Sequence, residues 1–282
     1  MRLIWKFKAL IVPVMLILSC DPVFTQEKPV NYYLNIDPST IVSENSEEQL
    51  YNVSLKWQNL DALNGNSFNC NVVYAIHSVD GSRNRASWDE VSMAQIKSFK
   101  DEPKKTVNLS ALDGFSYEIN NTDFLGESFY NELPDDLKDL ARWLVSDAIQ
   151  MQGMMWYYFD SLEFNTEFSP VMLENYNIEF ENWVKFTSRY QQLKWSSITK
   201  HNEEVCAVID FQSGYNPVQA KTDDMSFKGR SMYYGEIRVS LRDKQLEYAY
   251  MFEDVVMDLE GSMFPEKQLI DLQREIVFDR IK

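Results

Sequence analysis

Apolar and polar residues alternate along much of the first third of the chain. In residues 50–60, Tyr51, Val53, Leu55 and Trp57 are separated by polar side chains, which predicts a strand with one buried face. Residues 31–37 show a shorter alternation and predict another strand. A further strand is predicted over residues 69–81, because this apolar-rich run ends at an Asp-Gly turn signal.

Two stretches have the spacing of a helix instead. Ser87 is a suitable N-cap for residues 87–99, where Val91, Met93, Ile96 and Phe99 are near helical spacing, so we predict a short helix there. The clearest helical pattern runs from Pro134 to residue 162. It begins with proline in the first turn and aspartates near the positive end of the helix dipole. An apolar stripe then continues along it and predicts one long, half-buried helix.

The end of this long helix is apolar or aromatic on every side, which predicts burial against several neighbours. A cluster facing an apolar ligand is the alternative. The candidate ligand-binding residues are Met154, Met155, Trp156, Tyr158 and Phe159.

The last hundred residues predict antiparallel sheet. A two-residue turn at residues 243–244 would pair Leu241 with Leu246, Val239 with Tyr248 and Ile237 with Tyr250, and would place the large apolar residues on one face. A second turn at residues 202–203 would place Thr199 opposite Cys206, and Ile198 opposite Ala207. Residues 205–211 are almost continuously apolar, which indicates a strand covered on both faces. Residues 270–281 predict a strand or a short helix.

Together these elements predict the α+β class, with a mainly antiparallel sheet packed on one long helix. We expect a curved sheet similar to the half-barrel of lipoprotein carriers. Residues 31–282 are expected to form a single body, and a split into two domains near residues 160–175 is the alternative.

The N-terminus has the pattern of an export signal. Arg2, Lys6 and Lys8 precede an apolar core of residues 9–18, which is too short for a membrane-spanning helix of about 20 residues. Residues 17–20, Ile-Leu-Ser-Cys, resemble the lipobox of bacterial lipoproteins. This resemblance implies a signal peptide over residues 1–19, lipid attachment at Cys20, and a lipidated tether over residues 20–30 that binds the membrane. An ordinary signal peptide followed by a free cysteine is the alternative.

Residues 198–217 and 228–257 resemble segments of uncharacterised lipoproteins of Bacteroidota-type bacteria. The resemblance implies an exported lipoprotein fold without an assigned activity. We therefore expect a lipid-anchored protein of the cell envelope. The outer membrane is the expected location, and the inner membrane is the alternative because Asp21 follows Cys20.

The composition restricts the kinds of molecule that the protein is expected to bind. The chain has 27 Lys and Arg against 43 Asp and Glu, a net charge of −16, which argues against nucleic-acid binding. Its hydrophobic fraction of 45% supports a folded core. Besides Cys20 it has only Cys70 and Cys206, which either pair in an oxidising compartment or stay as buried free thiols.

The sequence offers little catalytic chemistry. His77 and His201 are the only histidines, and we interpret His77 as structural. His201 lies diagonal to Cys206 in the predicted hairpin, but a diagonal neighbour is about 7–8 Å away, so we do not expect a catalytic dyad. No zinc, calcium or phosphate-binding motif occurs, so we predict no catalytic residue, no metal and no cofactor.

Three classes of function remain. The first is a non-enzymatic binding or accessory module for an apolar small ligand or an envelope protein partner. The second is a structural subunit of an envelope complex, which would need a contiguous exposed apolar patch. The third is a carboxylate-dependent hydrolase of envelope polymers, which would need two convergent carboxyl groups and a raised pKa at one of them.

Overall fold

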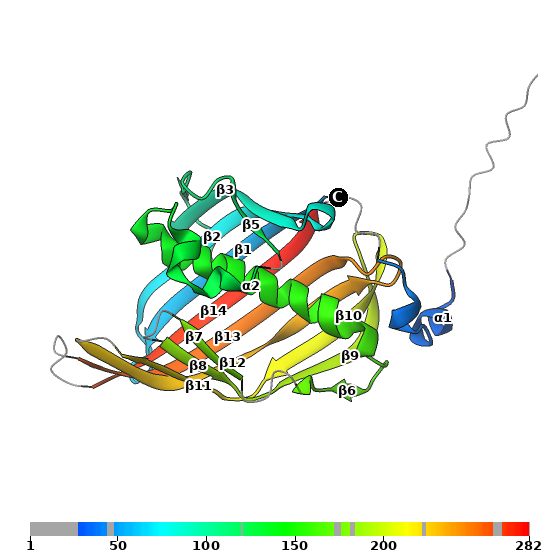
Figure 1. The fold of residues 1–282 in the computed structure, drawn as a ribbon. Helices are drawn as coiled ribbons and strands as arrows, with labels where there is room; N and C mark the ends of the chain where they lie inside the picture. Colours follow the sequence, from blue (N-terminus) through cyan, green and yellow to red (C-terminus); the bar gives the residue numbers. More distant parts are fainter. Residues whose placement is uncertain are drawn as a thin grey trace, which may run out of the picture.

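One large antiparallel sheet, crossed on one face by a single long helix, dominates the fold (Figure 1). The computed structural model describes residues 28–43, 48–119, 121–171, 176–180, 184–221, 224–261 and 267–281. Strands account for 55% of the residues and helices for 19%, and the sheet is open. The predicted α+β class is therefore wrong, because the protein is mainly β. The predicted half-barrel is also wrong, because the sheet does not curl toward closure.

The sheet contains 14 strands within the described part of the chain, and its main path runs β4-β3-β2-β1-β14-β13-β12-β10-β9-β6. The long strands of this path are β1 (Gln49–Asp61), β2 (Ser67–Asp80), β3 (Arg85–Gln95), β9 (Gln191–His201), β10 (Glu204–Ser213), β12 (Met225–Ser240), β13 (Leu246–Gly261) and β14 (Gln268–Ile281). The shorter strands are β4 (Val107–Asn108), β5 (Phe115–Glu118), β6 (Glu167–Phe168), β7 (Tyr176–Phe180), β8 (Val184–Ser188) and β11 (Asn216–Lys221). Short helical turns complete the chain: α1 (Val30–Leu34), η1 (Pro38–Thr40), η2 (Gly81–Arg83), η3 (Thr122–Leu125) and η4 (Glu127–Tyr130).

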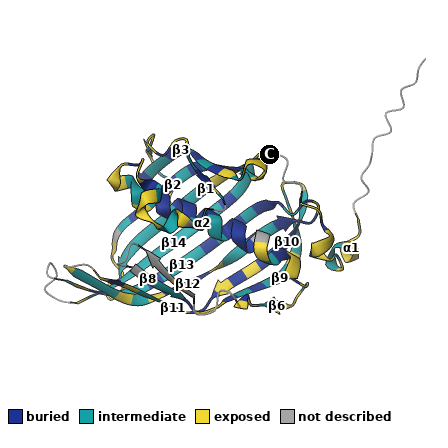
Figure 2. Cartoon of the chain, in the orientation of Figure 1, coloured by how far each residue is buried: buried dark blue, intermediate teal, exposed yellow. Residues whose placement is uncertain are grey.

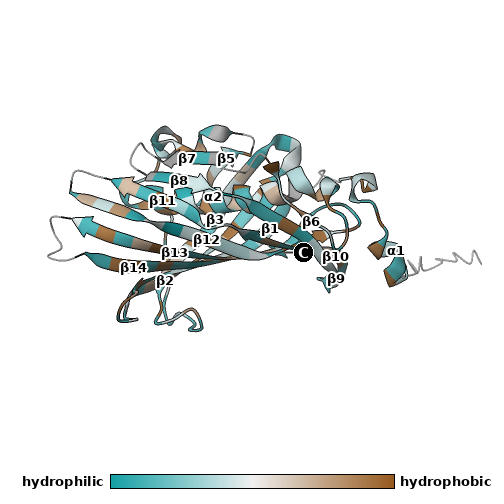
Figure 3. Cartoon of the chain, turned by 90° about the horizontal axis from the view of Figure 1, so that it is seen from below, coloured by the Kyte–Doolittle hydropathy of each residue, from teal (hydrophilic) through white to brown (hydrophobic). Residues whose placement is uncertain are grey.

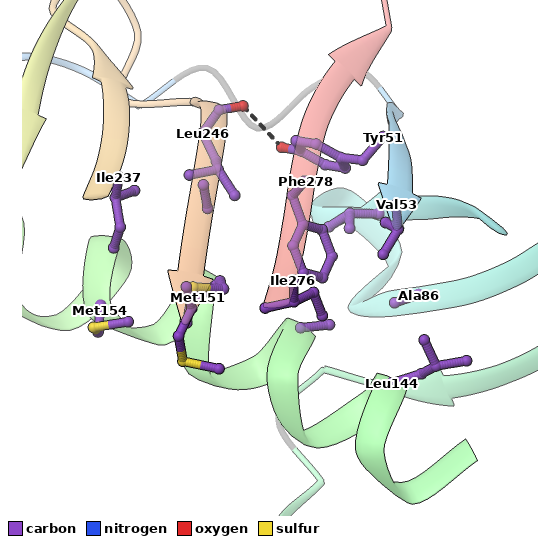
Figure 4. Packing of buried hydrophobic residues seen from close by; sticks show 14 of the residues in the cluster. Tyr51, Val53, Ala86, Leu144, Met151, Met154, Ile237, Leu246, Ile276 and Phe278 are labelled. Carbon is purple, nitrogen blue, oxygen red and sulfur yellow. Dashed lines mark hydrogen bonds between the residues drawn. The ribbon is translucent and has the colours of Figure 1, made fainter. Parts of the chain in front are cut away.

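The long helix is where the sequence predicts it. α2 (Asp135–Tyr158) continues into the turn η5 (Phe159–Ser161), and together they span 27 residues. Leu144 and Met151 on its inner side pack against the strands, as the buried side of α2 in Figure 2 and the close-up in Figure 4 show. There Phe278 and Ile276 of β14 face the helix, and Leu246 of β13 lies farther along the same core, where its carbonyl accepts from the Tyr51 hydroxyl at 3.1 Å.

The two faces of the sheet differ because side chains of successive strand residues point to opposite sides. Figure 3 shows this alternation of hydrophobic and hydrophilic residues along the long strands. We call the side covered by α2 the helix face and the opposite side the open face. On β12, Ile237 and Val239 belong to the core of the helix face, while Glu236 and Arg238 belong to the open face. Toward β2 the open face carries a second small core of Cys70, Val72, Ala94 and Ile96.

Residues 87–99 do not form the predicted helix. They lie largely in β3, where a register shift between Tyr74 and Ile76 of β2 marks a bulge, and Glu90 has a φ of 52°. The bulge adds one residue to β3, so the buried residues Trp88 and Val91 are three positions apart instead of two. This spacing resembles that of a helix. Residues 31–37 were predicted as a strand and instead form most of α1, with Asn35 Nδ2 donating to the carbonyl of Asn31 at 2.7 Å.

One of the two predicted hairpins has the predicted register. In β9–β10, Thr199 pairs with Cys206 and Ile198 with Ala207. In β12–β13 the register differs, since Val239 pairs with Leu246 rather than Tyr248, and a bulge follows Arg238. The loop is also longer than predicted. Five residues, 241–245, separate the strands, and the backbone amide of Ser240 donates to the carbonyl of Gln245 at 2.9 Å across the loop. The final segment is strand, within β14.

Candidate binding groove on the open face

A hollow of about 390 Å³ lies where β6, β9, β10 and β12 meet. Its lining combines amide, carboxylate, ammonium and aromatic groups. The lining residues are Glu167, Gln192, Leu193, Lys194, Asp210, Phe211, Gln212, Tyr234 and Gly235.

Strand register explains the shape of this groove. Leu193, Phe211 and Gly235 are direct cross-strand partners, and the side chains of the first two enter the core on the helix face. Their backbones therefore form the floor of the groove on the open face.

Two rows of open-face side chains form the walls. Gln192, Gln212 and Tyr234 are cross-strand partners on one side of the floor. Lys194, Asp210 and Glu236 are partners on the other side, and Glu167 of β6 pairs with Lys194. Residues two apart on a strand are separated by about 7 Å, which sets the width of the groove.

Polar groups on both walls are available to a ligand. Gln212 Nε2 donates to Gln192 Oε1 at 2.7 Å, which leaves further donors and acceptors on both amides. Beyond the backbone pairing of their strands, the side chains of Lys194 and Asp210 form no hydrogen bond or ion pair with any residue that the structure describes. Glu236 Oε1 accepts from Arg238 Nη2 at 2.5 Å.

The wall ends in an aromatic platform. Tyr234 is 45% exposed, and its ring centroid lies 5.6 Å from that of Phe252 on β13. Tyr250, the cross-strand partner of Glu236, continues the other wall onto the same strand. The rows of side chains that form the walls therefore continue past the hollow, which ends at β12, onto β13.

The predicted ligand-binding residues on α2 lie on the other side of the sheet. Met154 and Phe159 are 5% and 1% exposed and belong to the core, and Tyr158 packs against it. The side chains of Met155 and Trp156 lie outside the described residues, as does Cys20. An apolar ligand at this helix end stays a prediction, while the described side chains there pack as core.

His77 is buried in the core of the helix face. Its Nε2 lies 3.0 Å from the hydroxyl of Tyr117, and its ring centroid lies 4.2 Å from that of Trp88. Burial lowers the pKa of His77 to about 3, so the ring is neutral at physiological pH.

His201 and Cys206 do not form a dyad. His201 Nε2 lies 2.8 Å from Asp279 Oδ1, and its Nδ1 lies 3.2 Å from Arg238 Nη1. The Cys206 thiol instead donates to the carbonyl of Glu204 at 3.6 Å. Burial, followed by the nearby carboxylates of Glu247 and Glu204, raises the pKa of Cys206 to about 12, so the thiol stays protonated.

Cys70 and Cys206 are both free and buried. Within the described part of the chain, no three His, Cys, Asp or Glu side chains are grouped so that they could hold a metal ion.

A pair of carboxyl groups lies on the open face beside the groove. Asp254 of β13 and Asp271 of β14 lie close enough for one carboxyl to donate to the other once it is protonated, and Gln273 Nε2 donates to Asp271 Oδ2 at 2.9 Å. Burial, followed by the bond and the charge of Asp254, raises the pKa of Asp271 to about 7. Two carboxyls in hydrogen-bond contact are closer than the roughly 5 Å or more that glycoside hydrolysis needs. The pair therefore does not meet the geometric requirement for the alternative function, a carboxylate-dependent hydrolase.

Replacing Asp271 with asparagine should stabilise the protein at pH 8. The raised pKa means that the folded state favours the protonated pair, so the contribution of this pair to the wild-type free energy of unfolding is largest at or below about pH 4 and is lost as the pH rises through about 7. We expect Asp271→Asn to gain about 1–2 kcal/mol at pH 8, less than the full shift implies because solvent reaches the pair. Urea unfolding between pH 4 and 8 measures this gain. Glu132→Gln, which removes an exposed carboxylate, is the control and should show no such pH-dependent gain.

Comparisons with known proteins do not assign the chain to a family. No family model matches it, and a search of curated proteins gave no match. The described helices include none that is both long enough and apolar enough to cross a membrane.

Sequence reasoning missed the groove because its residues come from four strands. Alternating polar residues in 192–194 and 210–212 are the only local signal, since they place Lys194, Asp210 and Gln212 on the face opposite to Leu193 and Phe211. That signal becomes a site only when the register of β9, β10 and β12 is known.

Proposed function

We propose that the protein is a non-enzymatic binding module that holds a glycan in the groove on its open face. The observation that carries the proposal is the combination of an exposed aromatic ring, Tyr234, with unpaired polar side chains along a shallow hollow. Sugar rings present apolar C–H faces that stack on aromatic rings. Their hydroxyl groups bond to the planar amides and carboxylates that line these walls.

The charged side chains of the groove favour a glycan that is uncharged or weakly charged. The walls carry the carboxylates of Glu167, Asp210 and Glu236 against the cation Lys194, and Arg238, next to the wall, pairs with Glu236. This small local excess of negative charge, added to the net charge of −16 for the chain, disfavours polyanionic ligands.

Replacing Tyr234 with alanine should weaken glycan binding about tenfold, because an aromatic contact of this kind contributes about 1–1.5 kcal/mol. Isothermal titration of the full chain with chitotetraose measures the change. Chitotetraose is an uncharged tetrasaccharide of N-acetylglucosamine.

The control is Tyr157→Ala, since Tyr157 lies on α2, outside the groove, and is 70% exposed. This variant should bind like the wild type. The proposal fails if neither chitotetraose nor any member of an array of uncharged oligosaccharides binds the wild-type chain, or if both variants lose affinity equally.

We further propose that Cys20 carries the lipid that anchors this module in the cell envelope, at the outer membrane. The lipobox resemblance of residues 17–20 supports this proposal. Two or more acyl chains hold a protein stably at a bilayer.

Replacing Cys20 with serine should therefore remove the anchor. We expect the wild-type chain to incorporate an alkyne-labelled palmitate and to sediment with outer-membrane markers, and the Cys20→Ser variant to do neither. Equal labelling of the two chains would rule out Cys20 as the attachment site.

A further inference from the structure

We infer that the groove binds an internal stretch of an extended, uncharged polysaccharide, with the sugar chain running across the strands. This inference rests on the proposed glycan-binding function and specifies the form of the ligand.

The direction follows from the two walls. Both walls are cross-strand rows, so the groove between them runs perpendicular to the strands. Neighbouring strands are about 4.8 Å apart, so the distance from Glu167 on β6 to Phe252 on β13 is about 20 Å, room for roughly four sugars. The width of about 7 Å between the rows admits one sugar chain lying flat on the floor.

The floor favours a straight ligand. It is built from three backbone segments in register, at Leu193, Phe211 and Gly235, whose side chains or hydrogen lie on the helix face. A continuous floor between two cross-strand rows of side chains matches an extended chain with equivalent successive units. A site that recognised the terminal sugar of a chain would instead need side chains that close one end of the groove.

The two ends of the groove continue along the walls. At the β12 end, Tyr234 is the cross-strand partner of Phe252 on β13, with ring centroids 5.6 Å apart. In the other wall, Glu236 is the cross-strand partner of Tyr250. At the other end Glu167 is exposed on the short edge strand β6. A polymer can therefore enter and leave the groove without a free end being held.

The two ends also differ in chemistry. The aromatic end at Tyr234 offers stacking, and the end at Glu167 and Lys194 offers hydrogen bonds. A disaccharide is expected to bind at the aromatic end alone, and a tetrasaccharide is expected to reach both.

The test is a length series of N-acetylglucosamine oligosaccharides, from two to six units, titrated into the full chain. We expect affinity to rise at least tenfold from the disaccharide to the tetrasaccharide and to change little from four units to six. Reduction of the terminal sugar to its alditol should leave the affinity of the hexasaccharide within twofold. Glu167→Gln should weaken the tetrasaccharide several-fold and leave the disaccharide within twofold, with Tyr157→Ala as the matched control outside the groove.

Two outcomes would overturn this inference while glycan binding itself survived. One is equal affinity for the disaccharide and the tetrasaccharide, and the other is loss of binding when the terminal sugar is reduced. The absence of binding to any oligosaccharide would overturn the proposed function instead.

Discussion

Replacing Gly235 with alanine is expected to lower the free energy of unfolding by about 3 kcal/mol, the upper part of the range for an overpacked core. A β-carbon at this position would lie 1.9 Å from the carbonyl oxygen of Tyr250 and 2.8 Å from Cζ of Phe211. The first contact involves the backbone of β13, so relief requires β12 and β13 to shift apart. The second would displace the Phe211 ring, which is part of the core under the groove.

The measurement is chemical unfolding followed by circular dichroism. Gly153→Ala is the matched control, since its new β-carbon would meet Tyr157 at an ordinary 3.6 Å. Gly153 lies within α2, where alanine is favoured over glycine by up to about 1 kcal/mol, so this variant should be as stable as the wild type or more stable. A Gly235→Ala chain within 0.5 kcal/mol of the wild type would show that the strands adapt without cost.

Gly235 also links the fold to the proposed site, because its backbone is the β12 segment of the groove floor. A shift of β12 away from β13 would move Tyr234 relative to Phe252. We therefore expect the folded fraction of Gly235→Ala to bind chitotetraose more weakly than the wild type does.

Local sequence signals were sufficient where they determine a turn. In β9–β10, Asn202 and Glu203 have φ values of 47° and 65°, the left-handed pair of a type I′ turn, and asparagine tolerates that conformation. A two-residue turn leaves one register that agrees with the alternation of the flanking strands. The pairing of Thr199 with Cys206 could therefore be predicted from residues close in sequence.

The β12–β13 register could not be predicted in the same way. Its loop is held by side chains, with the amide of Arg242 donating to Ser240 Oγ at 3.1 Å and the amide of Gln245 donating to Asp243 Oδ1 at 3.1 Å. These bonds and the bulge after Arg238 shift the pairing, so that Ala249 rather than Tyr250 lies opposite Ile237. Tyr248 consequently leaves the core face, and the Arg238 guanidinium lies 4.5 Å from the centre of its ring. Neither the hydrogen bonds of the loop nor the bulge after Arg238 can be predicted from the pattern of apolar residues.

The groove also could not be predicted from local sequence, because it depends on the pairing of strands that are farther apart in the chain. Residues 205–211 were predicted to be covered on both faces, which holds for Val208 and Ile209. Asp210 instead points to solvent on the open face, as does Gln212, which directly follows the predicted run. Which residues stand beside them depends on pairings with segments about 20 residues away in either direction.

Replacing Arg274 with methionine is expected to cost about 3–5 kcal/mol of stability at pH 8, the usual result of removing one partner of a buried ion pair. Arg274 Nη2 donates to Asp147 Oδ1 of α2 at 3.0 Å, and its Nε donates to Glu253 Oε2 of β13 at 2.8 Å. The guanidinium also lies 5.3 Å from the ring centre of Trp143. Without it, two carboxylates between the helix and the sheet lose their shared cation.

The loss should depend on pH. Burial raises the pKa of Asp147 to about 6 even with Arg274 beside it, and removal of the cation raises it further. A raised carboxyl pKa contributes stability at low pH that is lost as the pH rises through the folded-state value. The gap between Arg274→Met and the wild type should therefore be smaller at pH 5 than at pH 8.

A double-mutant cycle separates the charge effect from lost packing. Adding Asp147→Asn to Arg274→Met removes the uncompensated charge, so the double variant should be more stable at pH 8 than Arg274→Met alone, with a coupling of about 2 kcal/mol. Lys138→Met is the surface control, because Lys138 pairs with an exposed Asp135 at 2.6 Å and should cost less than 1 kcal/mol. Equal losses at pH 5 and pH 8, with no coupling to Asp147, would mean that Arg274 stabilises the contact of α2 with the sheet through packing alone.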